Sequence, residues 1–361
     1  VLSAGRSRNM VIDRLDNKVL YVGSVSSGIF KSTDSGTSWL PVNDQDTVRN
    51  ISYLAQSADG TIYASTGEGF LRATAKSRSI PGTGLYKLSG NNLVQVKSST
   101  VTGSVINKIA CHPSNASNFA IAGTLGLLIT TDGGNTFTQA SGAIPATATA
   151  MTVYYDNSGN IFATATSSLN SGGYIYSKVY KSVGGGAGDF VDITPSSTEL
   201  PDMAYGRIEL GIANSNNNTI YASVAKSTTT NNISSATLYA FFVSKDAGSN
   251  WTLILEGSPQ LDPLSNGGSS AAGDYAHCVT VNPYNPDQVF IGSYKFYTWT
   301  KTTGGPEGIG TWIRYGNEFA FNSPIYLRQN IHDIKLITSG NDLLATYFVT
   351  DAGVYKSSDD L

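Results

Sequence analysis

The chain has 361 residues, and its 23 Lys and Arg nearly balance 26 Asp and Glu to give a formal net charge of -3. With so small a net charge the protein has only a weak overall electrostatic field, so we do not expect nucleic acid as a partner. No apolar run approaches the length of a membrane-spanning helix, so we expect no membrane insertion.

One short motif recurs along the chain. Residues 28–39 combine a strand, a tight turn of pattern [Ser/Thr]-x-Asp-x-Gly and a large aromatic residue, and near-copies stand at 128–137 and 242–251. A shortened copy follows at 353–361. The Asp side chain can accept backbone N–H groups around such a turn, and the Gly can adopt a left-handed backbone angle. Recurring hairpins of this kind indicate a repeat architecture.

Short strands fill the intervals between these turns. The first unit contains apolar runs at 9–12, 19–23 and 28–32, and a fourth strand opens at Trp39. The same pattern gives seven units, at approximately residues 6–41, 50–97, 105–140, 149–193, 206–255, 276–315 and 331–361. Four-stranded units repeated in this way predict an all-β fold, a seven-bladed β-propeller of four-stranded antiparallel blades in one domain spanning residues 1–361.

The last unit stops inside its turn and lacks an outer strand. We expect residues 1–5 to supply that strand and close the ring; a chain cut short is the alternative. The cysteines, Cys111 and Cys278, fall in different units, which favours free thiols over a disulfide. Neither has zinc-site spacing, and the chain has three His residues, so we predict no metal and no cofactor.

The hairpin Ser32-x-Asp34-x-Gly36-x-x-Trp39 and its copies resemble the Asp-box, or BNR, repeat of sialidases, xyloglucanase-type glycoside hydrolases, sortilin-like receptors and a photosystem assembly factor. Segments from Gly5 to Asp34, 273–283 and 330–357 are similar to secreted bacterial BNR-repeat proteins, so the resemblance spans nearly the whole chain. It implies that the Asp-box residues are structural, at an outer turn between third and fourth strands: Asp34, Asp132, Asp246, Trp39, Phe137 and Trp251. It implies little about activity, because one fold serves many functions.

Propellers bind ligands near the axis, on the face that carries the fourth-to-first and second-to-third strand connections. The long connections map there, at residues 66–82, 194–205, 226–235, 256–275 and 316–330. Residues just before each first strand should surround the channel mouth, and the candidates are Arg6, Arg8, Arg49, Asn107, Arg207, His277 and His332, with Arg328 close by. Guanidinium groups bind carboxylates in bidentate fashion, which suggests an anion pocket. Pairing with Asp46 or Asp202 is the alternative.

Enzyme signatures are weak. A sialidase-like site would need an Arg triad, yet Arg-Ile-Pro is missing near the N-terminus and sialidases have six units. A xyloglucanase-like site needs two facing carboxylates, and those enzymes resemble two clasped propellers. The catalytic residues are therefore unknown, and the loop carboxylates available are Asp44, Asp46, Glu68, Glu199, Asp202, Asp262, Asp274 and Glu318.

We therefore predict an extracellular or cell-surface binding module that recognises a glycan or a protein through its long-loop face. It would be a monomer or part of a larger multidomain chain. Aromatic residues in the loops are candidates to stack on sugars or to anchor a protein: Tyr205, Tyr275, Tyr294, Phe319, Phe321 and Tyr326. A glycoside hydrolase of the BNR-repeat type and a protein-assembly scaffold are the alternatives.

Overall fold

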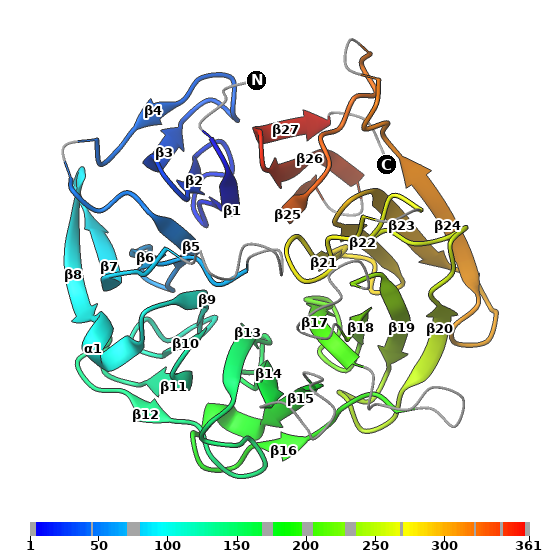
Figure 1. The fold of residues 1–361 in the computed structure, drawn as a ribbon, viewed down its shortest axis with the longest axis horizontal. Coiled ribbons are helices and arrows are strands. Elements are labelled where there is room, and N and C mark those ends of the chain that lie inside the picture. The colour runs from blue at the N-terminus through cyan, green and yellow to red at the C-terminus, as the bar shows by residue number, and fades with distance from the viewer. Residues whose placement is uncertain are drawn as a thin grey trace.

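A computed structural model describes residues 5–44, 46–70, 80–167, 176–196, 205–227, 236–267, 270–320, 323–339 and 342–357. These residues form seven antiparallel sheets arranged as a ring about one axis (Figure 1). In every sheet the strands follow chain order from the axis to the rim. The α-helix α1 (Ser99–Thr102) and a 3₁₀ turn at Val183–Gly185 are short. The predicted all-β, seven-bladed propeller is confirmed.

The first three sheets contain β1 (Ser7–Ile12), β2 (Leu20–Ser24), β3 (Gly28–Ser32) and β4 (Leu40–Pro41); β5 (Ile51–Gln56), β6 (Ile62–Thr66), β7 (Gly84–Ser89) and β8 (Asn92–Ser98); and β9 (Ile106–Cys111), β10 (Phe119–Gly123), β11 (Gly126–Thr130) and β12 (Thr138–Gln139). Sheets 4 and 5 contain β13 (Thr149–Tyr155), β14 (Ile161–Ser167), β15 (Tyr176–Ser182) and β16 (Val191–Asp192); and β17 (Tyr205–Ile212), β18 (Ile220–Lys226), β19 (Leu238–Ser244) and β20 (Thr252–Glu256). Sheets 6 and 7 contain β21 (Cys278–Val281), β22 (Gln288–Gly292), β23 (Phe296–Lys301) and β24 (Gly310–Tyr315); and β25 (Ile331–Ser339), β26 (Asp342–Thr350) and β27 (Gly353–Ser357).

Sheet 7 has three strands among the described residues, whereas the other six sheets have four. Of the segment expected to complete it, residues 1–4 lie outside the described residues, and ring closure by residues 1–5 stays a prediction. The first and last sheets nevertheless pack together. Met10 and Val22 share a buried cluster with Tyr347 and Val349, and the Tyr347 hydroxyl donates to the Ser35 carbonyl at 2.9 Å.

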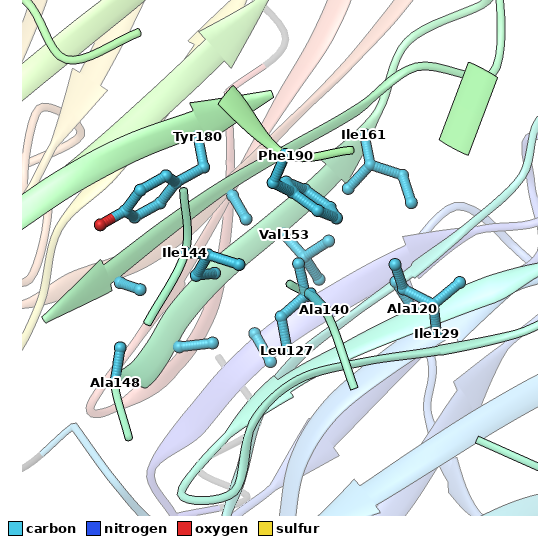
Figure 2. Packing of buried hydrophobic residues seen from close by; sticks show 14 residues of the cluster. Ala120, Leu127, Ile129, Ala140, Ile144, Ala148, Val153, Ile161, Tyr180 and Phe190 are labelled. Atoms are coloured by element: carbon cyan, nitrogen blue, oxygen red, sulfur yellow. The ribbon is translucent and has the colours of Figure 1, made fainter. Parts of the chain in front are cut away.

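Apolar side chains fill the space between neighbouring sheets. Figure 2 shows the interface of sheets 3 and 4, where Leu127 and Ala140 face Val153 and Phe190. The middle strands β10 and β11 are buried on both faces, and they therefore carry nearly continuous apolar runs instead of the alternation of a half-exposed strand. Removing this apolar surface from water is the main stabilising contribution to the ring.

Each sheet is also tied to the next by a hydrogen bond between a side chain and the main chain. One such bond stands at every interface: Asn9 Nδ2 to Leu54 O (2.7 Å), Ser52 Oγ to Ile106 O (2.6 Å), Asn107 Nδ2 to Ala150 O (3.0 Å), Thr164 Oγ1 to Ile208 O (3.2 Å), Arg207 Nη2 to His277 O (3.1 Å), Thr280 Oγ1 to Ile334 O (2.9 Å) and Met10 N to Asp333 Oδ2 (3.0 Å). The last bond joins sheet 7 to sheet 1 and completes the circle.

The three complete aspartate turns, at 32–39, 130–137 and 244–251, join third and fourth strands and share one hydrogen-bond pattern. In the second turn, Asp132 Oδ1 accepts from the Thr136 N–H (2.9 Å) and Oδ2 from the Thr136 hydroxyl (2.6 Å). The Thr130 hydroxyl donates to Asp132 Oδ1 (2.8 Å) and accepts from the Gly134 N–H (3.0 Å). Asp34 and Asp246 repeat this set with their own neighbours.

The aromatic residue after each turn packs inward from the rim. Trp251 Nε1 donates to the Ile193 carbonyl of the preceding sheet at 2.9 Å, and Trp39 Nε1 donates to Gly36 O within its own turn at 3.1 Å. The Phe137 ring meets Phe119 edge-on, with centroids 5.8 Å apart. The turns thus fix the sheet edges at the periphery, away from the axis.

Acid should weaken these turns. Hydrogen bonds from Thr136 and Thr130 lower the pKa of Asp132 to about 2. The turn therefore contributes stability above about pH 4, the usual carboxyl pKa, and loses it as pH falls towards 2. Thermal unfolding of wild type and Asp132→Asn should show a difference in Tm at pH 5 that narrows between pH 4 and 2. Asp44→Asn, at an exposed loop carboxylate, is the control; a pH-independent difference for Asp132→Asn contradicts the prediction.

The Asn9 side chain should make a measurable contribution to the free energy of unfolding. Its side chain donates to Leu54 O and accepts from Leu54 N (2.8 Å), and it is 1% exposed. Asn9→Ala leaves two buried main-chain groups unpaired, which should cost about 1–3 kcal/mol in denaturant unfolding. Asn17→Ala, in the exposed turn after β1, should leave the midpoint unchanged. Equal midpoints for both variants would disprove the role given to Asn9.

Candidate functional site

The inner strands carry extra residues where they begin. The β1, β5, β9, β13, β17 and β25 ladders each shift register near the start of the inner strand, as a β-bulge does. Four of the residues within these shifts are sequence-predicted site residues: Arg8, Asn107, Arg207 and His332. A bulge re-aims a side chain that regular pleating would direct into the neighbouring sheet. The bulges thus explain how polar residues of a buried strand reach the axis.

A cavity of about 340 Å³ follows the inner strands along the axis. Its polar and charged wall includes Arg8, Asn107, Lys108, Arg207, Glu209, His277, His332, Asp333 and Lys335. Both cysteines also line it; they are free, as predicted, with Cys278 buried and Cys111 partly buried. Burial raises the pKa of the Cys111 thiol to about 12, so this thiol stays protonated at neutral pH.

The mouth of the cavity is crossed by the connection between β6 and β7. Glu68, which is 2% exposed, forms ion pairs with both Arg6 and Arg8. Arg8 Nη2 also donates to the Phe70 carbonyl at 2.6 Å. The Phe70 ring lies under the Arg207 guanidinium, 3.7 Å from ring centre to Cζ. Residues 68–70 therefore link sheet 2 to sheets 1 and 5 across the axis.

A second network surrounds Asp351, after β26. Its Oδ1 accepts from the Tyr275 hydroxyl (2.7 Å) and lies 2.8 Å from His332 Nε2, while its Oδ2 accepts from Asn330 (2.8 Å). Burial favours the neutral acid, but these hydrogen bonds outweigh it and hold the pKa of Asp351 well below its usual value. Burial and the Arg8 charge lower the pKa of His332 to about 3, so His332 is neutral. Its Nδ1 then accepts from Arg8 Nη1 at 2.8 Å.

Glu209 is the centre of a third network, deeper in the cavity. Arg207 donates through Nε (2.9 Å) and Nη2 (2.6 Å) to Glu209 Oε1, and the Tyr154 hydroxyl donates to Oε2 (2.8 Å). Lys108 Nζ lies 3.8 Å from the same Oε2. Burial alone would raise the pKa of Glu209, but the charges of Arg207 and Lys108 prevail and lower it.

The structure brings six of the eight predicted site residues together: Arg6, Arg8, Asn107, Arg207, His277 and His332. Arg49 lies outside the cavity wall and donates to the Asp44 carbonyl on an exposed loop, and Arg328 is also not part of the wall. The arginines of the mouth do pair with carboxylates, but Glu68 and Glu209 take the place of the expected Asp46, whose carboxylate accepts from Leu93 N. Asp202 lies outside the described residues. Burial and the Arg207 charge lower the pKa of His277 to about 3, so it too is neutral.

Several residues of the site were not predicted: Lys108, Glu209, Asp333, Lys335, Asp351, Phe70 and Tyr154. A signal for some of them does exist in the sequence. Lys108, Glu209 and Lys335 are charged residues that alternate with apolar residues in the first strands of their units. Nothing in the neighbouring sequence, however, predicts which of these charges pair across different sheets.

Most of the aromatic loop residues predicted to stack on a sugar or to anchor a protein are not exposed in the described part of the chain. Tyr205 and Tyr294 are buried at 0% and 8% exposure, and Tyr275 is buried at 5% by its contacts in the mouth. These rings are used for packing, so they offer no face to a sugar. Phe319 is exposed, Tyr326 packs against Tyr355 (5.9 Å), and Phe321 and Glu199 lie outside the described residues.

Within the described ranges, no three His, Cys, Asp or Glu side chains gather closely enough to hold a metal ion. In the same part of the chain, no helix is long and apolar enough to cross a membrane. Two predicted loop carboxylates have local roles: Asp262 accepts from the Leu238 and Leu264 N–H groups, and Glu318 pairs with Arg314.

The sequence matches no established protein family and shows no significant similarity to curated proteins. Solved propellers share its fold. An ancestral GH74 enzyme has a TM-score of 0.64 and 16% identity over 99% of this chain, which spans 45% of that enzyme. YCF48 bound to D1 peptide has a TM-score of 0.58 and 13% identity, covering 100% of this chain and 94% of YCF48. The extracellular domain of the one-component system BT4673 from B. thetaiotaomicron has a TM-score of 0.62 and 10% identity. The match covers 98% of this chain and 38% of the BT4673 chain.

Glu68 should be needed to keep the mouth intact. Glu68→Ala would leave Arg8, whose side chain is 6% exposed, without its carboxylate partner. An uncompensated buried charge typically costs about 3–5 kcal/mol, which denaturant unfolding would measure. The exposed Glu256→Ala change on β20 is the control. If both variants unfold at the same denaturant concentration, the buried ion pairs do not stabilise the ring.

Proposed function

We propose that this protein is a secreted or cell-surface binding module that engages a protein or peptide through the propeller face carrying the long connections. The observation that carries the proposal is a pair of apolar side chains on the connection between β24 and β25, where Phe319 is 66% exposed and Ile325 is 59% exposed. Ile313 on β24 is also exposed. Large apolar side chains exposed on one connection are candidates for a protein interface.

The same surface suits a protein better than a glycan. Sugar recognition would require exposed aromatic faces, and three of the predicted rings are buried, as described above. An exposed Phe and an exposed Ile on one connection instead suit a pocket on a protein partner, where such anchors supply much of the binding energy. A single-propeller neighbour of nearly equal length, YCF48, was solved with a bound D1 peptide, which supports this ligand class. The extracellular domain of BT4673 supports the proposed location.

The electrostatics of the channel favour binding over glycoside hydrolysis. A glycosidase needs one carboxylic acid that stays protonated near neutral pH. In the described part of the cavity, the pKa of Glu209 is lowered, and so is that of Asp351 at the mouth. Glu68 is engaged by two arginines. These carboxylates act as fixed counter-ions, and their positions support a rigid platform beneath the long-loop face.

The proposal is tested by selecting ligands for the whole chain from phage-displayed random peptides and, in parallel, from a glycan array. We expect peptide ligands, and we expect Phe319→Asp to weaken the selected peptides at least tenfold because it places a charge in the apolar contact. Leu15→Asp is the matched control, since Leu15 is 94% exposed in the β1–β2 turn at the other end of the inner strand.

Two outcomes would contradict the proposal. Glycans binding where no peptide does would restore the glycan alternative, and equal losses from Phe319→Asp and Leu15→Asp would show that the long-loop face is not the site. Turnover of aryl glycosides that Glu209→Gln abolishes would identify a hydrolase instead.

A further inference from the structure

Lys108 occupies an unusual position in the cavity wall. It lies on the inner strand β9, its side chain is 14% exposed, and its Nζ stands 3.6 Å from the ring centre of Tyr154 and 5.7 Å from that of Tyr53. Its nearest carboxylate oxygen, Glu209 Oε2, is 3.8 Å away and already accepts the Tyr154 hydroxyl. The other Glu209 oxygen is taken by Arg207. Lys108 is therefore a buried amine that shares its one close carboxylate, Glu209, with Arg207 and Tyr154.

We propose that Lys108 is a nucleophilic amine that forms an imine with a small α-oxo acid inside the channel. This activity is separate from the protein-binding face and does not depend on it. Lysines used in this way are typically desolvated and set beside other cations, because both conditions favour the neutral amine. Lys108 meets both conditions.

The charged and titratable groups around Lys108 come from every side of the cavity: Tyr53 on β5, Tyr154 on β13, Arg207 and Glu209 on β17, and Asp333 and Lys335 on β25. Burial is the largest influence and lowers the pKa of Lys108 to about 8, with Lys335 and Arg207 acting in the same direction. Glu209 and Asp333 oppose the shift. The two rings also accommodate an ammonium by cation–π attraction, so the pH profile is part of the test.

The reaction balances without any oxidant or reductant. The neutral Lys108 Nζ attacks the carbonyl carbon, a C–N bond forms as the carbonyl π bond breaks, and one nitrogen proton moves to the former carbonyl oxygen to give a carbinolamine. The second nitrogen proton leaves with the hydroxyl group. Loss of the carbinolamine hydroxyl as water then leaves the imine. The net change is amine plus carbonyl compound to imine plus one water.

Basic side chains in the wall provide donors for an anionic carbonyl compound. Among the described residues it holds four basic side chains and two acidic ones: Arg8, Lys108, Arg207 and Lys335 against Glu209 and Asp333. When Lys108 is neutral, Arg8, Arg207 and Lys335 remain as cations, and they pair with Glu68, Glu209 and Asp333 respectively. A substrate carboxylate therefore shares these cations with the carboxylates of the protein. A volume of about 340 Å³ is at the small end of ligand pockets, which suits a compound of a few carbon atoms.

The experiment uses the whole chain with glyoxylate and sodium cyanoborohydride, which reduces an imine to a stable secondary amine, followed by peptide mapping by mass spectrometry. At pH 7.5 about a quarter of a lysine with a pKa near 8 is neutral, against about 0.1% of an ordinary lysine. We expect Lys108 to be labelled at least about tenfold faster than the exposed Lys18 in the same tube, with a rate that rises through about pH 8.

Glycolaldehyde, an uncharged probe, is run alongside, and the Lys108-to-Lys18 ratio should be higher for glyoxylate than for glycolaldehyde. Lys108→Arg, which keeps the charge, should lose the fast label, whereas Lys18→Arg should retain it. Labelling of Lys108 no faster than Lys18 overturns the nucleophile, and this result needs no variant. Equal ratios for the two probes overturn the choice of an anionic ligand.

Discussion

Mutual burial between neighbouring sheets is the constraint on which the whole structure depends. No sheet can cover its own apolar faces, so each requires a neighbour on both sides, and a ring satisfies this requirement without leaving an end exposed. The cluster of Leu127, Val153 and Phe190 in Figure 2 is one of these interfaces, and the contact of Met10 with Tyr347 is another. The side-chain hydrogen bonds between inner strands then fix how each sheet is placed against the next.

The ring leaves a narrow channel along its axis, and the buried polar groups that line this channel need hydrogen-bond or ion-pair partners. Bulges at the start of the inner strands place Arg8, Arg207 and His332 there, where their partners are Glu68, Glu209 and Asp351 respectively. Most of these groups are satisfied by one another, which makes the mouth rigid. Lys108 differs because its nearest carboxylate, Glu209, already accepts hydrogen bonds from Tyr154 and Arg207.

Local chemistry explains what could be predicted from the sequence. The turn around Asp132 is specified by residues within seven positions of one another, and so the repeats, the strands and the fold class follow from the chain alone. The clustering of Arg8, Asn107 and His332 follows from their equivalent places in the repeat. The pairing of Arg8 with Glu68 could not be predicted in this way, because Glu68 lies on a connection whose path no local sequence pattern describes. Tyr275 was expected at the surface because its loop is long, whereas packing on Arg8 and His332 buries it.

The contact between Met10 and Tyr347 has a consequence for biosynthesis. The two residues are far apart in sequence, so the first sheet emerges from the ribosome long before the surface that covers it. Until β26 is translated, one flank of the nascent sheet 1 stays exposed to solvent and to other chains. Closure must also bring distant parts of the polypeptide together, which slows the final folding step and lengthens the period in which this apolar flank is open to aggregation.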